Sequence, residues 1–330
     1  MNDPIPMAEL WRGGFLESVH LGHAVICNSE GEIVQAWGDP DQVILPRSSS
    51  KMIQALPLLE SGAAAGLSED RVALCCASHQ GAAIHTERVA TWLADMGLGE
   101  SDLRCGAHMP RDETALRTLI CADEAPCQIH NNCSGKHTGF LTLTQHLGAG
   151  PDYIDPGHPV QRLVREAFED VTGLESPGYG IDGCSAPNFA TTVQGLARAM
   201  AFFAGAREEF GSGRERAAAR LVNAMRAYPD LVAGEGRAGT ELMRAMGGKV
   251  AVKTGAEAVF VAILPERKLG VALKIVDGAT RASECAITAI LVKLGVLEPD
   301  HPAVLKRMNA PVRNCNGIDA AYMRPAAALV

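Results

Sequence analysis

The spacing of hydrophobic residues changes along the chain and divides it into three segments. Residues 23–38 alternate as two short strands around a bend at Ser29–Gly31. The long middle repeats at three- and four-residue intervals, which predicts helices over 85–98, 157–173, 188–205 and 214–228. The last part returns to short apolar runs, which predict strands over 249–255, 257–265 and 269–278 and a closing helix over 281–297.

This order of elements predicts a mixed α/β fold. Strands from the two ends of the chain can share one antiparallel sheet only if the helical middle is inserted between them. We therefore expect a single two-lobed domain over residues 1–330. Its sheet lobe would span about 1–47 and 248–330, and its helical lobe about 48–247.

The first candidate chemistry lies where the chain would enter the helical lobe, in the segment PRSSSKMIQAL at 46–56. Of its three serines, only Ser48 stands three residues before Lys51, and residues three apart share a face of a helix. The spacing places a hydroxyl beside an amine that can take its proton, which is one way to build a nucleophile. The alternative is structural: the serines cap a helix and Lys51 faces solvent.

A second motif, Lys253-Thr254-Gly255-Ala256, lies on the first strand after the helical middle. Together with the upstream Ser-x-x-Lys it resembles the serine β-lactamases, penicillin-binding proteins and serine-type glutaminases. An ordinary lysine, with a pKa of about 10.4, is a poor base at neutral pH, and burial beside a second cation would lower that pKa. An edge-strand lysine next to a glycine bulge is the alternative. The chain has no Ser-Asp-Asn motif in its middle part, which argues against a β-lactamase or transpeptidase.

Charge and composition exclude several classes of partner. The formal net charge of -8 gives no general attraction to nucleic acid or to an anionic membrane. No apolar run reaches the roughly 18 residues of a membrane span, and the first residues lack the pattern of a signal peptide. We therefore expect a cytoplasmic protein whose ten cysteines are mostly thiols.

Two cysteines stand apart from the rest. Cys133, in HNNCSGKHTGFL, and Cys184, in GYGIDGCSAPNFA, each lie in a glycine-rich polar loop that leads into a predicted helix. Two thiolates together with His130, His137 or Asp182 would suit zinc. The spacing is not a Cys-x-x-Cys pattern, so glycine turns and helix caps remain the alternative.

These stretches together resemble one family, the asparaginase II-like amidohydrolases or Rhizobium-type L-asparaginases. The resemblance rests on PRSSSKMIQALPLLESGAA, CCASHQGAAIHTERV, LRCGAHMP, NNCSGKHTGFL, GYGIDGCSAPNFA and KTGAEAVF, and it covers roughly residues 10–320. It implies a fold like that of the serine β-lactamases and glutaminases. The threonine signatures of the other two asparaginase classes are absent from the sequence.

The resemblance also implies roles for individual residues. Ser48 and Lys51 match the family's nucleophile and base, and Ser78 with Lys253 matches its second Ser–Lys pair. The backbone N–H groups of Ser48 and Ala256 match the oxyanion donors. The implied zinc ligands are Cys133, Lys136 and Cys184. The implied substrate-binding residues are Arg47, His137 and Asp182, with Asp182 also near the metal.

The implied activity is hydrolysis of L-asparagine to L-aspartate and ammonia through an acyl-enzyme, with zinc near the substrate pocket. A glutaminase, or a hydrolase of another small amide or ester, is the alternative within the same fold. Glutamine has one methylene more than asparagine, and a pocket discriminates against one methylene by only ~1–3 kcal/mol. A zinc- or thiol-based binding protein is the alternative from another class. The family further implies a homodimer.

Overall fold

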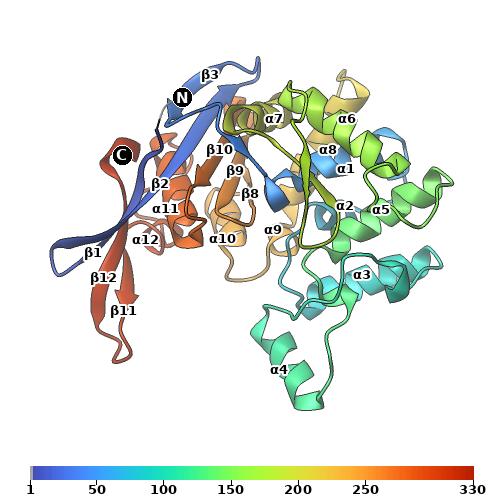
Figure 1. The fold of residues 1–330 in the computed structure, drawn as a ribbon, viewed down its shortest axis with the longest axis horizontal. Coiled ribbons are helices and arrows are strands. Elements are labelled where there is room, and N and C mark those ends of the chain that lie inside the picture. Colours follow the sequence, from blue (N-terminus) through green and yellow to red (C-terminus); the bar gives the residue numbers. More distant parts are fainter. Residues whose placement is uncertain (1–2) are drawn as a thin grey trace. The chain divides into compact units, whose positions relative to one another are not determined.

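Eight strands form one antiparallel sheet in the computed structural model, which describes residues 3–330. Seven of them follow the order β11-β12-β1-β2-β10-β9-β8, and β3 also pairs with β2. The strands are β1 (Ile5–Arg12), β2 (Phe15–Asn28), β3 (Ile33–Trp37), β8 (Ala251–Thr254), β9 (Val259–Leu264), β10 (Leu269–Ile275), β11 (Ala310–Arg313) and β12 (Asp319–Pro325). The mixed α/β class and the sheet built from both ends of the chain are thus confirmed (Figure 1).

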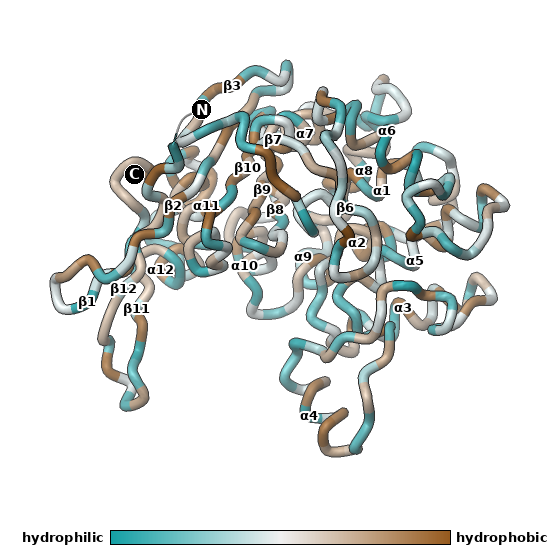
Figure 2. The backbone as a smooth tube through the Cα atoms, viewed as in Figure 1, coloured by the Kyte–Doolittle hydropathy of each residue, from teal (hydrophilic) through white to brown (hydrophobic). Residues whose placement is uncertain are grey.

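Two helices cover this sheet. Every residue of β9 is buried, and successive residues of a strand point to opposite faces, so both faces are covered. The covering helices are α7 (Val193–Gly205) and α11 (Thr280–Lys293), and both pack against β9 and β10. A side chain at Gly270 on β10 would place its Cβ only 2.0 Å from the backbone nitrogen of Ala201, so α7 lies directly on the strand backbone. In Figure 2, hydrophobic residues follow these central strands.

The chain divides into two units of contacting residues. The sheet unit holds the described residues up to Ser49, together with Thr191–Gly205 and Glu241–Val330. The helical unit holds Ser50–Ala190 and Ala206–Thr240. The boundaries differ from the expected 47/48 and 247/248. They also place 191–205 with the sheet, because the apolar residues of α7 are buried against strands rather than against other helices.

The helical unit is built around α1 (Lys51–Glu60). Eight of its ten residues are buried, from Lys51 through Leu58, which is typical of a helix surrounded by others. Its neighbours are α5 (Ser134–His146), α6 (Pro159–Thr172) and α8 (Gly213–Ala227). The remaining helices are α2 (Glu69–Cys75), α3 (Ala83–Asp95), α4 (Glu113–Ala122) and α9 (Pro229–Val232), while α10 (Ala238–Ala245) crosses the boundary and α12 (Pro302–Leu305) belongs to the sheet unit.

Some elements differ from their predictions. The short apolar run before Ser78 would suit a buried strand as well as a buried helix, and it forms helix α2, with Cys75 and Cys76 at its end. The helix expected from residue 188 begins at Val193, after two short strands, β6 (Pro187–Phe189) and β7 (Thr191–Thr192). β7 pairs with β4 (Val43–Ile44), and β6 pairs with β5 (Tyr179–Ile181). Within residues 3–330, no helix has the length and hydrophobicity to cross a bilayer.

Candidate functional site

A tight turn in the sheet unit carries Ser48. The segment η1 (Arg47–Ser50) is a 3₁₀ turn that runs straight into α1. Ser49 fixes it, because its backbone N–H and its hydroxyl both donate to the carbonyl of Pro46, at 3.3 and 2.8 Å. Arg47 adopts a φ of 55°, a conformation that costs energy for a residue with a side chain and often accompanies functional sites. Ser49 and Ser50 are buried, whereas Ser48 is only half-buried and so retains access to a reactant.

The Lys-Thr-Gly strand ends against this same turn. A Cβ on Gly255 would lie 2.6 Å from the carbonyl oxygen of Pro46 and 3.2 Å from the backbone nitrogen of Ser49. Only glycine permits so close an approach between the end of β8 and the turn of Ser48. Within the sheet unit, the structure therefore brings the end of the Lys-Thr-Gly strand against the turn of Ser48, about 200 residues earlier in the sequence.

Lys253 lies on β8, an edge strand of the sheet, but it is not a solvated edge residue. Its side chain is only 2% exposed, and its amine donates to the carbonyl oxygen of Thr254 at 2.8 Å. Ala256, the expected oxyanion donor, is the second residue after the end of the strand at Thr254. Although β8 is an edge strand, the side chain of Lys253 is therefore directed into the protein rather than into solvent.

Lys51 is completely buried in the helical unit. Its amine donates to the carbonyl oxygen of Ala77, and it lies 3.5 Å from the carbonyl oxygen of Asn132 and 3.1 Å from Cys133 Sγ. An ammonium group has three protons to donate, which matches these three acceptors. In this arrangement Lys51 is a hydrogen-bond donor, so it would have to release one contact to take a proton from a serine.

Ser78 lies in the loop that follows α2, one residue beyond the carbonyl that Lys51 contacts. Its backbone N–H donates to the carbonyl of Val232 at 2.8 Å, and its side chain is half-buried. The next residue, His79, is buried and lies 2.9 Å from the hydroxyl of Ser134 through Nε2. Contacts with α9, through Val232, and with α5, through Ser134, thus hold the loop of Ser78 in place within the helical unit.

Cys133, Lys136 and Cys184 form one buried cluster in the helical unit. Cys133 caps the N-terminus of α5, and Lys136 follows in the first turn of that helix. Cys184 comes from the tight turn between β5 and β6, where the N–H of Ser185 donates to the carbonyl of Asp182 at 2.8 Å. Lys136 Nζ lies 3.1 Å from Cys184 Sγ, and the two cysteines are hydrogen-bonded to one another.

The charges within this cluster are coupled. The hydrogen bond to Cys184, and then burial, raise the pKa of Cys133 to about 12. The same hydrogen bond, together with Lys136, holds the pKa of Cys184 well below its usual range. Burial alone would lower the pKa of Lys136, but the charges of Cys184 and Cys133 outweigh it and raise that pKa. These directions favour one thiolate and one thiol within the Cys133–Cys184 pair, next to a charged Lys136.

These three side chains can bind a soft metal ion only after the remaining thiol and the lysine ammonium have each lost a proton. Zinc binds thiolates readily, but a lysine amine coordinates only when neutral. No group of three or more His, Cys, Asp or Glu side chains with the arrangement of a metal site occurs within residues 3–330, so a metal here would need Lys136. The two sulfur atoms and one nitrogen atom fit zinc chemically in their deprotonated state.

His137 and Asp182 border this cluster. His137 is fully buried, and its Nδ1 lies 2.9 Å from the hydroxyl of Tyr153. Its Nε2 has no hydrogen-bond partner in the part of the chain that the structure describes. Burial, followed by the charge of Lys136, lowers the pKa of His137 well below its usual range, so its ring is neutral. Asp182 is half-buried, and its carboxylate accepts the N–H of Gly183 at 2.7 Å.

Sequence reasoning missed several of these contacts. Tyr153 lies in a loop outside every quoted motif, and His79 adjoins Ser78 without a recognisable pattern of its own. The contact between Lys51 and Cys133 joins residues 82 positions apart. Only the histidine in the segment ASHQ could have been noted from sequence, as a polar residue next to a candidate serine.

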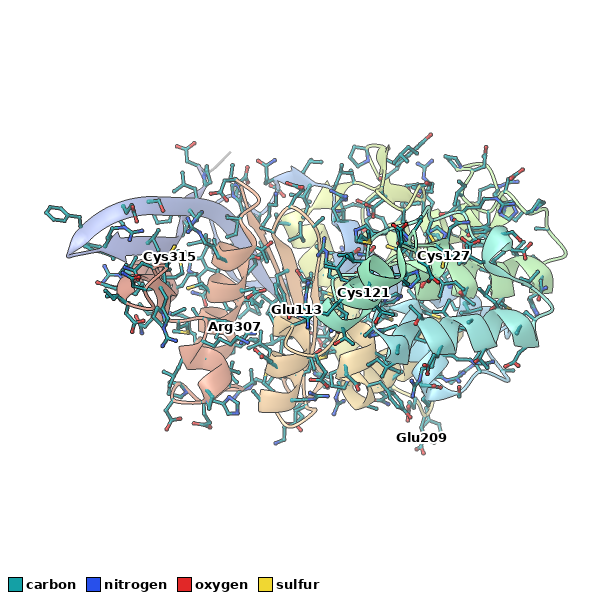
Figure 3. The ribbon with its side chains drawn as sticks, turned by 90° about the horizontal axis from the view of Figure 1, so that it is seen from below. Glu113, Cys121, Cys127, Glu209, Arg307 and Cys315 are labelled. Atoms are coloured by element: carbon teal, nitrogen blue, oxygen red, sulfur yellow. The ribbon has the colours of Figure 1, made fainter. Side chains whose placement is uncertain are left out.

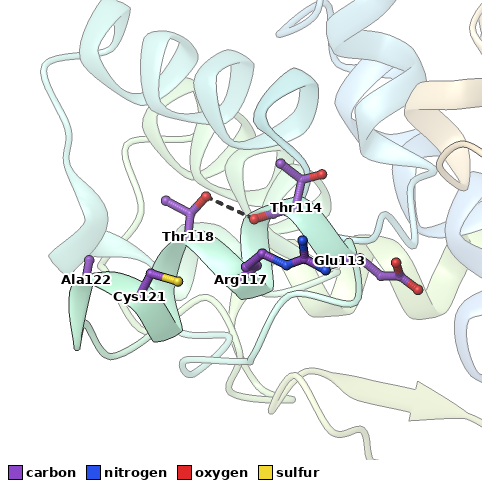
Figure 4. A pocket seen from close by; sticks show the side chains of 6 residues that line it. All are labelled: Glu113, Thr114, Arg117, Thr118, Cys121 and Ala122. Atoms are coloured by element: carbon purple, nitrogen blue, oxygen red, sulfur yellow. Dashed lines mark hydrogen bonds between the residues drawn. The ribbon is translucent and has the colours of Figure 1, made fainter.

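One further hollow lies along helix α4 (Figure 4). All of its lining residues come from this single helix: Glu113, Thr114, Arg117, Thr118, Cys121 and Ala122. The only hydrogen bond drawn there is an ordinary contact within the helix, from the Thr118 hydroxyl to the Thr114 carbonyl. No polar groups from other elements converge on it, so it is not a candidate active site.

The fold and the motifs define a mixed α/β protein with a Ser-x-x-Lys turn and a Lys-Thr-Gly strand end. More specifically, the chain belongs to the L-asparaginase II family, whose family model matches residues 8–325. The predicted family is thereby confirmed. No curated protein is similar enough to this chain to count as a match.

Several solved structures are similar at low sequence identity. Mglu in its tris and glutamate form shares 14% identity, with a TM-score of 0.47 over 91% of this chain and 64% of that chain. A β-lactamase from Mycobacterium bovis shares 13% identity, with a TM-score of 0.45 over 82% of this chain and 94% of that chain. A putative β-lactamase from Bacteroides dorei shares 11% identity, with a TM-score of 0.45 over 82% of this chain and 93% of that chain. This chain spans less than two thirds of the length of Mglu in that form.

Proposed function

We propose that this protein is an L-asparaginase, which hydrolyses the side-chain amide of L-asparagine to L-aspartate and ammonia. The observation that carries the proposal is the close approach of Gly255 to the turn of Ser48, in a chain of the L-asparaginase II family. Ala256 follows Gly255 in the chain, which supports its backbone N–H as the proposed donor near Ser48. Acyl transfer needs such a pairing, with a nucleophile beside preorganised N–H donors.

In this mechanism the Ser48 hydroxyl attacks the amide carbonyl carbon. Lys51 takes the serine proton, and the carbonyl oxygen becomes an oxyanion that accepts hydrogen bonds from the N–H groups of Ser48 and Ala256. Collapse of the intermediate breaks the C–N bond, ammonia leaves with a proton, and a β-aspartyl ester remains on Ser48. Water then hydrolyses this ester and restores the serine hydroxyl.

The remaining residues assist binding and proton transfer. Ser78 and Lys253, which match the family's second Ser–Lys pair, are each proposed to assist proton transfer. Arg47 is the proposed partner of the substrate carboxylate, because its guanidinium suits a carboxylate geometrically. His137 and Asp182 are the proposed contacts to the polar end of the substrate.

Cys133, Lys136 and Cys184 would hold a zinc ion. Zinc would supply a fixed positive charge that attracts and orients a polar group of the substrate. The chain's own contribution is the burial of all three side chains, which excludes water from the donors, and the two tight turns that fix their positions.

The direct test is ammonia release from L-asparagine and L-glutamine by the purified protein. Ser48→Ala should abolish turnover, whereas Ser101→Ala, at an exposed serine, should leave it unchanged. Turnover of L-glutamine at equal efficiency would identify the protein as a broader amidase. Tight zinc binding without turnover of any small amide or ester would favour the binding-protein alternative and reject the hydrolase. A homodimer and a cytoplasmic location stay predictions, for light scattering and cell fractionation to check.

A further inference from the structure

The hydroxyl group of Tyr153 determines where the imidazole of His137 carries its hydrogen. The backbone N–H of Arg104 donates to the Tyr153 oxygen at 2.8 Å, and His137 Nδ1 lies 2.9 Å from the same oxygen. Both rings are fully buried, and they meet nearly edge to face, with centroids 5.4 Å apart and planes at 69°. The Tyr153 backbone is fixed as well, because Gln161 donates to its carbonyl at 2.7 Å.

A count of hydrogen-bonding groups distinguishes the two neutral tautomers of His137. If the hydrogen is on Nε2, then Nδ1 accepts the hydroxyl proton of Tyr153, and only the Nε2–H donor is left unpaired. If the hydrogen is on Nδ1, it donates to the Tyr153 oxygen. Both the hydroxyl proton and the bare Nε2 are then buried without partners among the described contacts. Since each unpaired buried polar group is unfavourable, the first tautomer is preferred.

The Nε2–H group is therefore a buried donor without a hydrogen-bond partner among residues 3–330. Nδ1 faces Tyr153, and the two nitrogens of an imidazole point in divergent directions, so Nε2–H points away from Tyr153. His137 lies four residues after Cys133 on α5, and residues with this spacing share a helix face. Cys133 in turn contacts the amine of Lys51.

We propose that Tyr153 is a positioning residue: it holds His137 in the tautomer with hydrogen on Nε2, and this N–H binds an acceptor oxygen of the amide substrate. The contact of this N–H with the substrate rests on the proposed function. The position of the hydrogen on Nε2 rests only on the contacts of Tyr153 and His137. Because Nε2–H is a hydrogen-bond donor, the substrate atom that it binds must be an acceptor, such as an oxygen of a carboxylate or of an amide carbonyl.

The first experiment reads the tautomer without using activity. Protein labelled with ¹⁵N at histidine gives ring signals that distinguish hydrogen on Nε2 from hydrogen on Nδ1, and His137→Gln assigns them by loss of one set. We expect a single Nε2–H form in the wild type and a mixture of forms in Tyr153→Phe, which keeps the ring but removes the hydroxyl. Tyr322→Phe, at a partly exposed tyrosine of the sheet unit, is the control and should keep the wild-type spectrum. An Nδ1–H form in the wild type, or an unchanged spectrum in Tyr153→Phe, overturns the tautomer assignment.

The second experiment tests the contact with substrate. L-Asparagine added to Ser48→Ala protein, which cannot turn it over, should shift the His137 Nε2–H signal. An absent shift under saturating substrate overturns the contact while leaving the tautomer result intact.

In the active enzyme, Tyr153→Phe should raise KM about tenfold with a smaller change in kcat, the size expected for one hydrogen bond to a polar ligand. His137→Gln places an amide N–H₂ near the position of Nε2, and His137→Asn places one near Nδ1. The glutamine variant should therefore retain more affinity than the asparagine variant. Equal losses in the two variants would contradict a role for Nε2–H. A wild-type protein that releases no ammonia would reject the proposed function, but the labelled spectra would still decide the tautomer.

Discussion

The amine of Lys51 lies 3.1 Å from the sulfur of Cys133. This contact connects the proposed Ser-x-x-Lys motif to the cluster of Cys133, Lys136 and Cys184. The sequence alone gives no sign that these two features are in contact. Cys133 also hydrogen-bonds to Cys184, which contacts Lys136. A change in the protonation of the cysteines therefore alters the charge next to the proposed base, since buried charges interact strongly at this distance.

Replacing Lys51 should impair chemistry more than stability. Lys51→Met keeps most of the side-chain volume but removes the amine, so we expect kcat to fall by about 10²–10⁴-fold, the usual contribution of a general base. The carbonyl of Ala77 loses its donor, which should lower the free energy of unfolding by about 1–3 kcal/mol. Ammonia release and urea unfolding measure the two effects. Lys249→Met, at an exposed lysine, is the control, and full activity in Lys51→Met would exclude this residue as the base.

Enlarging Gly255 should displace the turn that carries Ser48. The Cβ of Gly255→Ala would lie 2.6 Å from the Pro46 carbonyl, closer than such atoms approach, so the strand end and the turn must separate. We expect a loss of kcat/KM of at least about tenfold, because small displacements of reacting groups are costly in rate. Gly66→Ala, whose Cβ would meet nothing within 4 Å, should leave kcat/KM unchanged. Wild-type kinetics in Gly255→Ala would show that the approach of β8 has no catalytic role.

Zinc binding should depend on the cluster and on pH. Cys133→Ser and Cys184→Ser should each reduce the zinc content of protein equilibrated with the ion and then desalted, whereas Cys315→Ser, at an exposed cysteine, should not. The Cys133 thiol and the Lys136 ammonium must each lose a proton before they coordinate, and the pKa of both is raised. Zinc affinity should therefore increase as the pH rises, and calorimetry in buffers of different ionisation enthalpy should detect proton release. Affinity that is independent of pH would contradict this ligand set.

An ion-pair cluster in the sheet unit should stabilise the protein in a pH-dependent manner. Glu241 on α10 lies 2.5 Å from Arg307 and 2.7 Å from Lys306, just after α12, and Arg307 is labelled in Figure 3. Burial alone would raise the pKa of Glu241, but the hydrogen bonds from Lys306 and Arg307 outweigh it and lower that pKa. Because the pKa of Glu241 is lower in the folded state, its ionised form stabilises the fold. This stabilisation is complete above the unfolded pKa of about 4.3 and disappears as the pH falls through the folded pKa.

Glu241→Gln should therefore lower the free energy of unfolding by about 1–3 kcal/mol at pH 7, because it leaves the buried Arg307 partly unpaired. The difference from the wild type should shrink as the pH falls below about 4. Urea unfolding over this pH range measures it, with Glu266→Gln at an exposed carboxylate as the control. A difference that is constant with pH would indicate a packing effect rather than the charge of Glu241.

Local patterns of the sequence predicted those features that depend on neighbouring residues. The turn at Ser29–Gly31 joins β2 to β3, and Gly173 ends α6 in the left-handed conformation that favours glycine. The contacts of Lys51 with Cys133 and of His137 with Tyr153 could not be predicted in this way. They depend on how helices and loops pack at long range, and spacing in one sequence carries no information on that packing.

The pairing of the two ends of the chain has a consequence for synthesis. β1 pairs with β12, and β2 at the centre of the sheet pairs with β10, which the ribosome makes about 240 residues later. The first two strands are therefore available as a hairpin long before their other partners exist, with unsatisfied backbone groups and apolar residues that can associate with other chains. The helical unit, whose contacts are largely complete by Thr240, can form in the meantime. Maturation of this protein would then end with the sheet, because β8 to β12 are made after the helical unit, and only then can the strand end at Gly255 meet the turn of Ser48.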